Sequence, residues 1–187
     1  MAPLLGLPIP LLPIHIFWIN LVTDGLPGLA FTAEPVEPNT MKRPPKDPTE
    51  GIFTRALIIH IVWVGLLLGV ICIATQYISL ELNSPKWQTM VFTVLSLSQM
   101  GHALAIRSAT TSLFTQKLGS NKQLTAAVGL TLVLQLSVIY VPFLQDTFHT
   151  QALNWQELLI CLGISSITFW AIEIDKWRRR RSHSVNN

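Results

Sequence analysis

Residues 13–31, PIHIFWINLVTDGLPGLAF, form an apolar run that is interrupted near its centre by the polar side chains Asn20, Thr23 and Asp24. Such a run is long enough to cross a bilayer, because a spanning helix needs about 20 residues. Four further apolar runs follow, and the five expected spans are 11–31, 55–77, 88–106, 123–143 and 154–174. They occupy more than half of the chain, so the sequence predicts an all-α, polytopic membrane bundle of five helices.

The composition agrees with this prediction. Of the 187 residues, 50% are hydrophobic and only 12% are charged, and the mean hydropathy is +0.45. Cys72 and Cys161 both fall inside apolar runs, which indicates packed or lipid-facing thiols rather than a disulfide. The basic tail follows directly on a membrane helix, so membrane lipid is its expected partner and nucleic acid is not.

The positive charges indicate the orientation of the spans. If all five runs cross, 12 of the 13 Lys and Arg residues lie on one side and only Lys86 lies on the other. Because cytoplasmic segments carry an excess of Lys and Arg, loops 32–54 and 107–122 and the tail 175–187 are expected in the cytoplasm. An odd number of spans then places residues 1–10 outside, which suggests that further chain precedes Met1.

The polar cluster in the first span has the spacing i, i+3, i+4, so on a regular helix its three side chains share one face. An ionised Asp at the centre of a bilayer costs at least about 2.5–3.5 kcal/mol and therefore needs a partner, a wet cavity or an ion. Pro27 and the glycines beside it weaken the following turn of helix, as in the ion sites of transporters. Oxygen-only donors favour hard cations such as calcium, magnesium, manganese or sodium.

Two alternatives remain open on the residues alone. The cluster could belong to a proton relay that includes His15, His60 or His102. Asp24 could instead pair with a basic residue on a neighbouring helix, although the sequence places no Lys or Arg deep in any span.

Three stretches together resemble a known family. Residues 5–31, LGLPIPLLPIHIFWINLVTDGLPGLAF, closely resemble the sixth transmembrane helix of P-type calcium-transporting ATPases and the loop before it. Residues 34–53 resemble the cytoplasmic loop that follows, and residues 89–104, TMVFTVLSLSQMGHAL, resemble the eighth helix. The chain is thereby identified as the C-terminal membrane domain of such a pump, helices six to ten.

The resemblance also implies what this chain lacks. It has no DKTG phosphorylation motif, no nucleotide-binding domain and no counterpart of helices one to five. Magnesium and ATP would be bound by those absent domains, so the chain alone is expected neither to be phosphorylated nor to hydrolyse ATP. Its expected partners are the N-terminal helices and cytoplasmic domains of the same pump.

The family's ligands can be carried over position by position. Asp24 matches the aspartate that bridges the calcium sites, Asn20 matches a ligand of one site and Thr23 a ligand of the other. Gln99 stands where pumps that move two calcium ions have a glutamate, and it resembles the plasma-membrane pumps that move one. The resemblance therefore implies metal ligands at Asn20, Thr23, Asp24 and Gln99 and transport of one calcium ion per cycle.

Two other functions fit the same sequence. A chain of this length could be a stand-alone, non-enzymatic membrane fragment or a regulator that binds a pump. A pump of the same architecture could also carry manganese or sodium instead of calcium.

Overall fold

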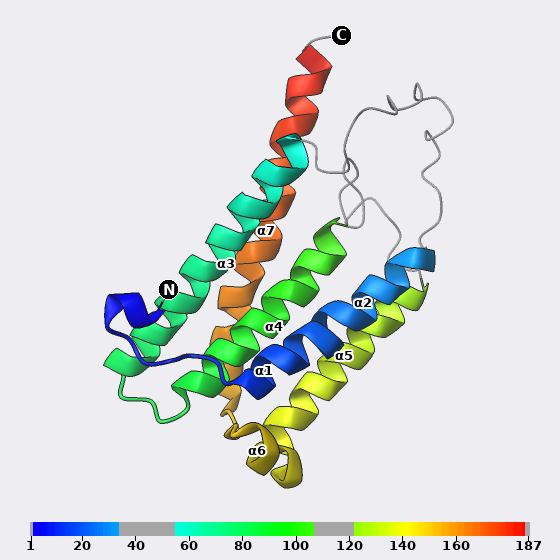
Figure 1. Cartoon of the computed structure of the whole chain (residues 1–187). Coiled ribbons are helices and arrows are strands. Elements are labelled where there is room, and N and C mark those ends of the chain that lie inside the picture. Colours follow the sequence, from blue (N-terminus) through cyan, green and yellow to red (C-terminus); the bar gives the residue numbers. More distant parts are fainter. Residues whose placement is uncertain (1, 34–54, 107–121, 186–187) are drawn as a thin grey trace.

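The computed structural model describes residues 2–33, 55–106 and 122–185, and within these ranges it contains helices and turns but no strand (Figure 1). Five helical segments there are long and apolar enough to cross a membrane: Pro13–Phe31, Leu57–Glu81, Trp87–Ile106, Lys122–Tyr140 and Trp155–Arg178. The predicted all-α bundle of five helices is thus confirmed. Of the expected loops 32–54 and 107–122, residues 34–54 and 107–121 lie outside the described residues.

The first span is built from three consecutive pieces. These are α1 (Pro13–Trp18), a π-helical segment (Ile19–Asp24) and α2 (Gly25–Ala30). Pro13 occupies the first position of α1, where its missing N–H and fixed φ cost nothing. Short 3₁₀ turns, Ala2–Leu5 and Phe31–Ala33, lie on either side of this span.

The other spans are α3 (Arg55–Glu81), α4 (Trp87–Ile106), α5 (Lys122–Tyr140) and α7 (Trp155–Val185). A short helix, α6 (Pro142–Phe148), follows α5 after the single extended residue Val141. Pro142 explains this break, because a residue before proline is disfavoured in helical conformation and proline suits the first position of the next helix. Helix α7 continues through most of the expected basic tail.

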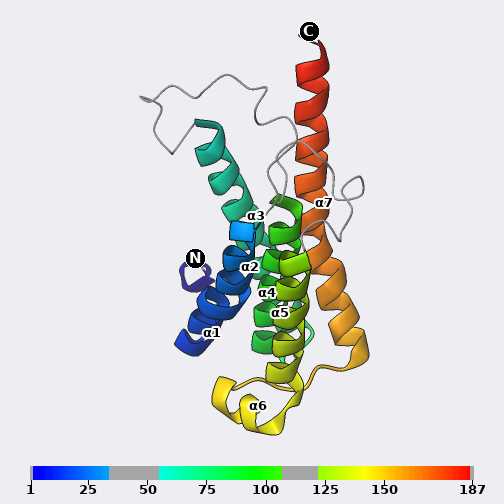
Figure 2. The same ribbon diagram turned by 90° about the vertical axis from the view of Figure 1, so that its right-hand side faces the viewer.

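Helix α4 is the centre of the bundle. It packs against α7, α3, α5 and the π-helical segment of the first span (Figure 2). Its buried Met90 and Val94 pack with Ile71 and Cys161, while Phe92 on another side packs with Val138 and Ile19. The outer helices instead expose large apolar side chains such as Leu66, which is 64% exposed. Such surfaces suit lipid, so the packing core of this membrane protein surrounds α4.

The two ends of the bundle differ in structure. Helix α6 and the turn between α3 and α4 lie at one end, and the C-terminal ends of α2, α4 and α7 lie at the other (Figure 1). At this second end Lys176 is buried, donates to the Ala105 carbonyl of α4 and pairs with Glu173 at 3.0 Å. A basic side chain commonly satisfies the last carbonyls of a helix in this way. Lys176, expected in a cytoplasmic tail, therefore joins α7 to α4.

Replacing a side chain at the centre of the bundle should loosen it. Phe92 is fully buried and stacks on His15 at 4.5 Å between ring centroids. Phe→Ala costs about 3–5 kcal/mol in water-soluble cores, and we expect Phe92→Ala to cost less, because the reference solvent here is lipid. Denaturation by SDS of the chain in mixed micelles should show a lower midpoint. Leu66→Ala is the matched control at a lipid-facing position, and an equal shift in both variants would contradict this packing.

Candidate cation site

The polar motif of the first span coincides with its π-helical segment, Ile19–Asp24. The sequence predicted a weakened turn at Gly25–Gly28, but α2 is regular there and the irregular turn lies just before it. A Cβ atom at Gly25 would stand 3.4 Å from the Asn20 carbonyl oxygen, which is van der Waals contact, so this turn does not by itself require glycine. Pro27 lies in the first turn of α2, where helix geometry tolerates it. Single π turns inside α-helices are frequent at functional sites.

The wide turn separates the three motif side chains. Asn20 and Asp24 are exposed, whereas Thr23 is buried at 1% exposure. The prediction that all three share one face is therefore wrong for Thr23. A π turn holds more residues than an α turn, so each residue turns less about the axis and position i+3 falls short of the face of position i. The Thr23 hydroxyl has no hydrogen-bond partner among the described residues.

Asp24 and Gln99 are brought together across the bundle. The Gln99 amide Nε2 on α4 donates to Asp24 Oδ2 at 3.4 Å, although the two residues are 75 positions apart in the chain. The Gln99 Oε1 is buried and has no partner among the described residues. A carboxylate and an unpaired carbonyl oxygen therefore lie next to each other on two helices.

Asn20 lies one turn before Asp24 and is also exposed. Its Nδ2 donates to the Ile16 carbonyl at 2.9 Å, which fixes the amide and leaves its carbonyl oxygen as an acceptor. Of the four residues predicted as ligands, Asn20 and Asp24 are thus exposed on the first span, and the amide of Gln99, whose Oε1 is buried, contacts Asp24 from α4.

The described residues give little support to pairing of Asp24 with a basic side chain. In this part of the structure the ion pairs are Lys86–Glu157 and Lys176–Glu173, each at 3.0 Å, and neither involves Asp24.

The histidines take up separate positions. His15 is buried, and its Nε2 lies 2.7 Å from the carbonyl oxygen of Phe148, the last residue of α6. His102 lies on α4, one turn after Gln99, and His60 lies on α3. Their rings stack with 5.9 Å between the centroids. His15 thus has a structural role at the end of the first span, and only the His60–His102 pair lies near enough to Gln99 for the proton-relay alternative.

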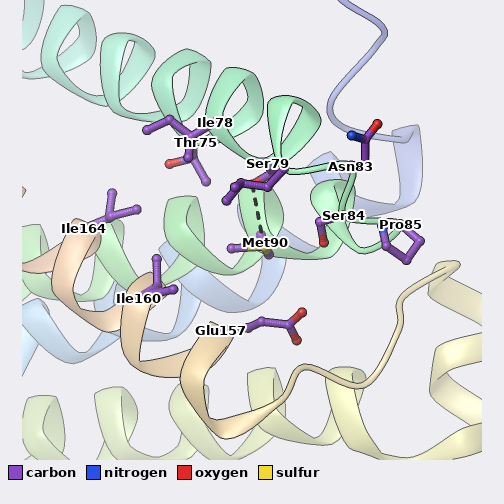
Figure 3. A pocket seen from close by; sticks show the side chains of 11 residues that line it. Thr75, Ile78, Ser79, Asn83, Ser84, Pro85, Met90, Glu157, Ile160 and Ile164 are labelled. Atoms are coloured by element: carbon purple, nitrogen blue, oxygen red, sulfur yellow. Dashed lines mark hydrogen bonds between the residues drawn. The ribbon is translucent and has the colours of Figure 1, made fainter.

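A separate pocket of about 420 Å³ opens between the ends of α3, α4 and α7 (Figure 3). Its walls are mainly apolar, from Ile78, Ile160 and Ile164, and the Ser79 hydroxyl points to the Met90 sulfur at 3.6 Å. None of the four predicted ligands lines this pocket. This pocket is therefore separate from the residues predicted to bind the cation.

The number of acidic side chains limits what this site can hold alone. Among the described residues no group of three or more His, Cys, Asp or Glu side chains could hold a metal ion. Calcium takes six to eight oxygen ligands, and one carboxylate with three uncharged side chains does not supply them. These four side chains alone would therefore not complete a calcium site.

Two buried polar residues of α5 also touch the first span, and sequence reasoning missed them. Gln135 accepts a hydrogen bond from Trp18 Nε1 at 3.0 Å, and Thr131 lies 3.5 Å from the Val22 carbonyl oxygen. The sequence does contain a signal for them, because Thr131 and Gln135 are polar residues one turn apart in an otherwise apolar span.

Comparison with known proteins agrees with the geometry. Residues 8–178 match the family model described as "Cation transporting ATPase, C-terminus". The chain is 41% identical over 169 residues to a calcium-transporting ATPase of Bacillus subtilis, covering 89% of this chain and 19% of that protein. It is 37% identical over 188 residues to calcium-transporting ATPase 1 of Yarrowia lipolytica, covering 100% of this chain and 20% of the relative.

A human relative, calcium-transporting ATPase type 2C member 1, is 34% identical over 187 residues, which cover 99% of this chain and 20% of that protein. The chain thus spans about a fifth of the length of the curated relatives that it matches. The family model covers most of the chain, and the described residues include five helices long and apolar enough to cross a membrane. The chain therefore belongs to the cation-transporting ATPase family, of which it represents the C-terminal membrane region.

Proposed function

We propose that this chain supplies cation ligands to an ATP-driven calcium pump that exports calcium from the cytoplasm. The observation that carries the proposal is the contact between Asp24 Oδ2 and Gln99 Nε2, which joins the motif to the central helix. Asp24 is the charged ligand, Asn20 and Gln99 contribute amide oxygens, and Thr23 supports them. All these donors are oxygen atoms, which favours a hard divalent cation.

The remaining ligands would come from other helices of the same pump. Asn20 and Asp24 are exposed along the first span, and the relatives are about five times longer than this chain. A helix from the N-terminal part of the pump, packed on this side, would add oxygens and exclude lipid from the carboxylate. Magnesium and ATP belong to the cytoplasmic domains, which would pass the energy of phosphorylation to these helices.

Thr23 has a different position from the other ligands. Its hydroxyl is buried and unpaired among the described residues, so it reaches the cation only if the π-helical segment rotates towards α-helical geometry. Loss of the Thr23 hydroxyl should therefore weaken calcium binding less than loss of the Asp24 charge.

Removing the charge of Asp24 should disable calcium binding. The test uses a chimeric pump in which residues 8–178 replace the matching segment of the Bacillus subtilis enzyme. Asp24→Asn should raise the half-saturating calcium concentration for uptake into inverted vesicles by about 10- to 100-fold, because a bond to a charged group contributes about 1.5–3 kcal/mol.

Asp146→Asn is the matched control, since Asp146 is exposed on α6 at the opposite end of the bundle. Unchanged calcium dependence in Asp24→Asn would contradict the proposal. A folded chimera that takes up manganese or sodium but not calcium would support a pump for another cation, and one that transports nothing would favour a stand-alone regulator or fragment.

The transport stoichiometry tests the role of Gln99. With glutamine in place of a second carboxylate, we expect one calcium ion transported per ATP hydrolysed by the chimera. Parallel measurement of radioactive calcium uptake and phosphate release gives this ratio. A ratio of two would show that the uncharged Gln99 does not limit the pump to one ion.

The orientation of the spans follows from the basic residues and is also part of the proposal. Cysteines introduced one at a time, in a background without Cys72 and Cys161, report the side of the membrane. An impermeant thiol reagent added to intact cells should label Asn83→Cys, in the turn between α3 and α4, and should spare Gln123→Cys at the start of α5. The reverse labelling pattern would overturn the positive-inside assignment.

A further inference from the structure

Helix α5 has one polar side that is completely covered. Gln135 and Thr131 lie one helical turn apart, and both are 0% exposed, while the neighbouring Leu130 and Val133 are at least 50% exposed. The two polar side chains therefore face the bundle, and the apolar ones face outwards. Helix α5 packs there on α2, the last piece of the first span.

Gln135 contacts the first span just before the cation motif, and Thr131 contacts it inside the motif. Gln135 Oε1 accepts from Trp18 Nε1 at 3.0 Å, and Trp18 directly precedes the π-helical segment. The Thr131 hydroxyl lies 2.9 Å from the Ala127 carbonyl oxygen of its own helix and 3.5 Å from that of Val22, inside the segment. The Gln135 bond is the stronger link, and the hydroxyl of Thr131 is shared between two carbonyls.

The second contact has a reason in the backbone of the first span. Continued π-type pairing would require residue 27 to donate to the Val22 carbonyl, but Pro27 has no N–H. The Thr131 hydroxyl has a single proton and lies 2.9 Å from the Ala127 carbonyl oxygen, so at 3.5 Å it makes only a weak contact with the Val22 carbonyl oxygen. This weak contact lies at the point where π geometry gives way to α2.

Burying Gln135 carries a free-energy cost that packing alone does not explain. Its Nε2 is buried and has no hydrogen-bond partner among the described residues. A buried amide left half unpaired is unfavourable, and an apolar side chain of the same length would avoid that cost. The amide is therefore better explained by the bond that it makes to Trp18 than by the stability of α5.

We propose that Gln135, assisted by Thr131, is a positioning residue of the cation site. Through Trp18 and Val22 the two residues fix the rotation of the π-helical segment and hence the direction in which Asn20 and Asp24 face. Neither residue of α5 touches the cation. The inference rests on the proposed function of that site.

The first experiment measures calcium dependence in the chimeric pump. Gln135→Met removes the acceptor at nearly constant size and should raise the half-saturating calcium concentration about 3- to 10-fold, with maximal turnover and thermal stability retained. Gln123→Met is the matched control, because Gln123 is exposed on the same helix. An unchanged half-saturating concentration in Gln135→Met would overturn the proposal.

A double-mutant cycle separates positioning from a structural effect. Trp18→Phe removes the same hydrogen bond from the other side and keeps the test usable if Gln135→Met does not fold. If the two substitutions act through the same hydrogen bond, the double variant should raise the half-saturating calcium concentration no further than the single variant with the larger effect. Shifts that multiply would show that the two residues act independently and would contradict the proposal.

A second measurement does not depend on transport. Hydrogen–deuterium exchange of the 187-residue chain in lipid nanodiscs, read by mass spectrometry, should be faster over residues 19–24 in Gln135→Met than in the unaltered chain. The middle of α7 serves as the internal reference and should not change. If exchange is faster but the wild-type chimera neither binds nor transports calcium, the proposed function is refuted and the positioning role of Gln135 is not. If exchange is unchanged, the positioning role alone is refuted.

Discussion

A carboxylate at membrane depth needs compensation, and the arrangement of this bundle follows from that need. Asp24 lies in the first span, makes no ion pair among the described residues, and has the Gln99 amide 3.4 Å away on the central helix. An amide contact is weaker compensation than a full positive charge. The carboxylate therefore keeps much of its attraction for a cation, which is the property that a transport site requires.

The packing around α4 fixes the place of that contact. Helix α4 is buried among α3, α5, α7 and the first span, so its side chains cannot shift without disturbing several neighbours. Gln99 takes its position from this rigid helix, whereas Asp24 belongs to a span with a π turn. A residue held by a packed helix, facing one on a span with a π turn, would suit the proposed site, which has to bind and release an ion.

The adjustable span is itself held from the other side. Trp18 is bonded to Gln135, and His15 at the start of the span is 2.7 Å from the Phe148 carbonyl oxygen. These contacts bind the first half of the span to α5 and α6, while Asn20 and Asp24 stay exposed. The first span therefore has one face held by this chain and another on which Asn20 and Asp24 are exposed.

The sequence by itself determined the number of spans, the polar motif and its oxygen chemistry, because hydropathy and motif spacing are local properties of the chain. It also pointed to Gln99, but only through family resemblance. Tertiary structure decided that Gln99 meets Asp24, that Thr23 turns inwards and that Gln135 reaches Trp18. The helical turn at the motif was also misplaced from sequence, at Gly25–Gly28 instead of Ile19–Asp24. These features depend on how separate helices pack, and the register of a turn is set by contacts from residues more than a hundred positions away.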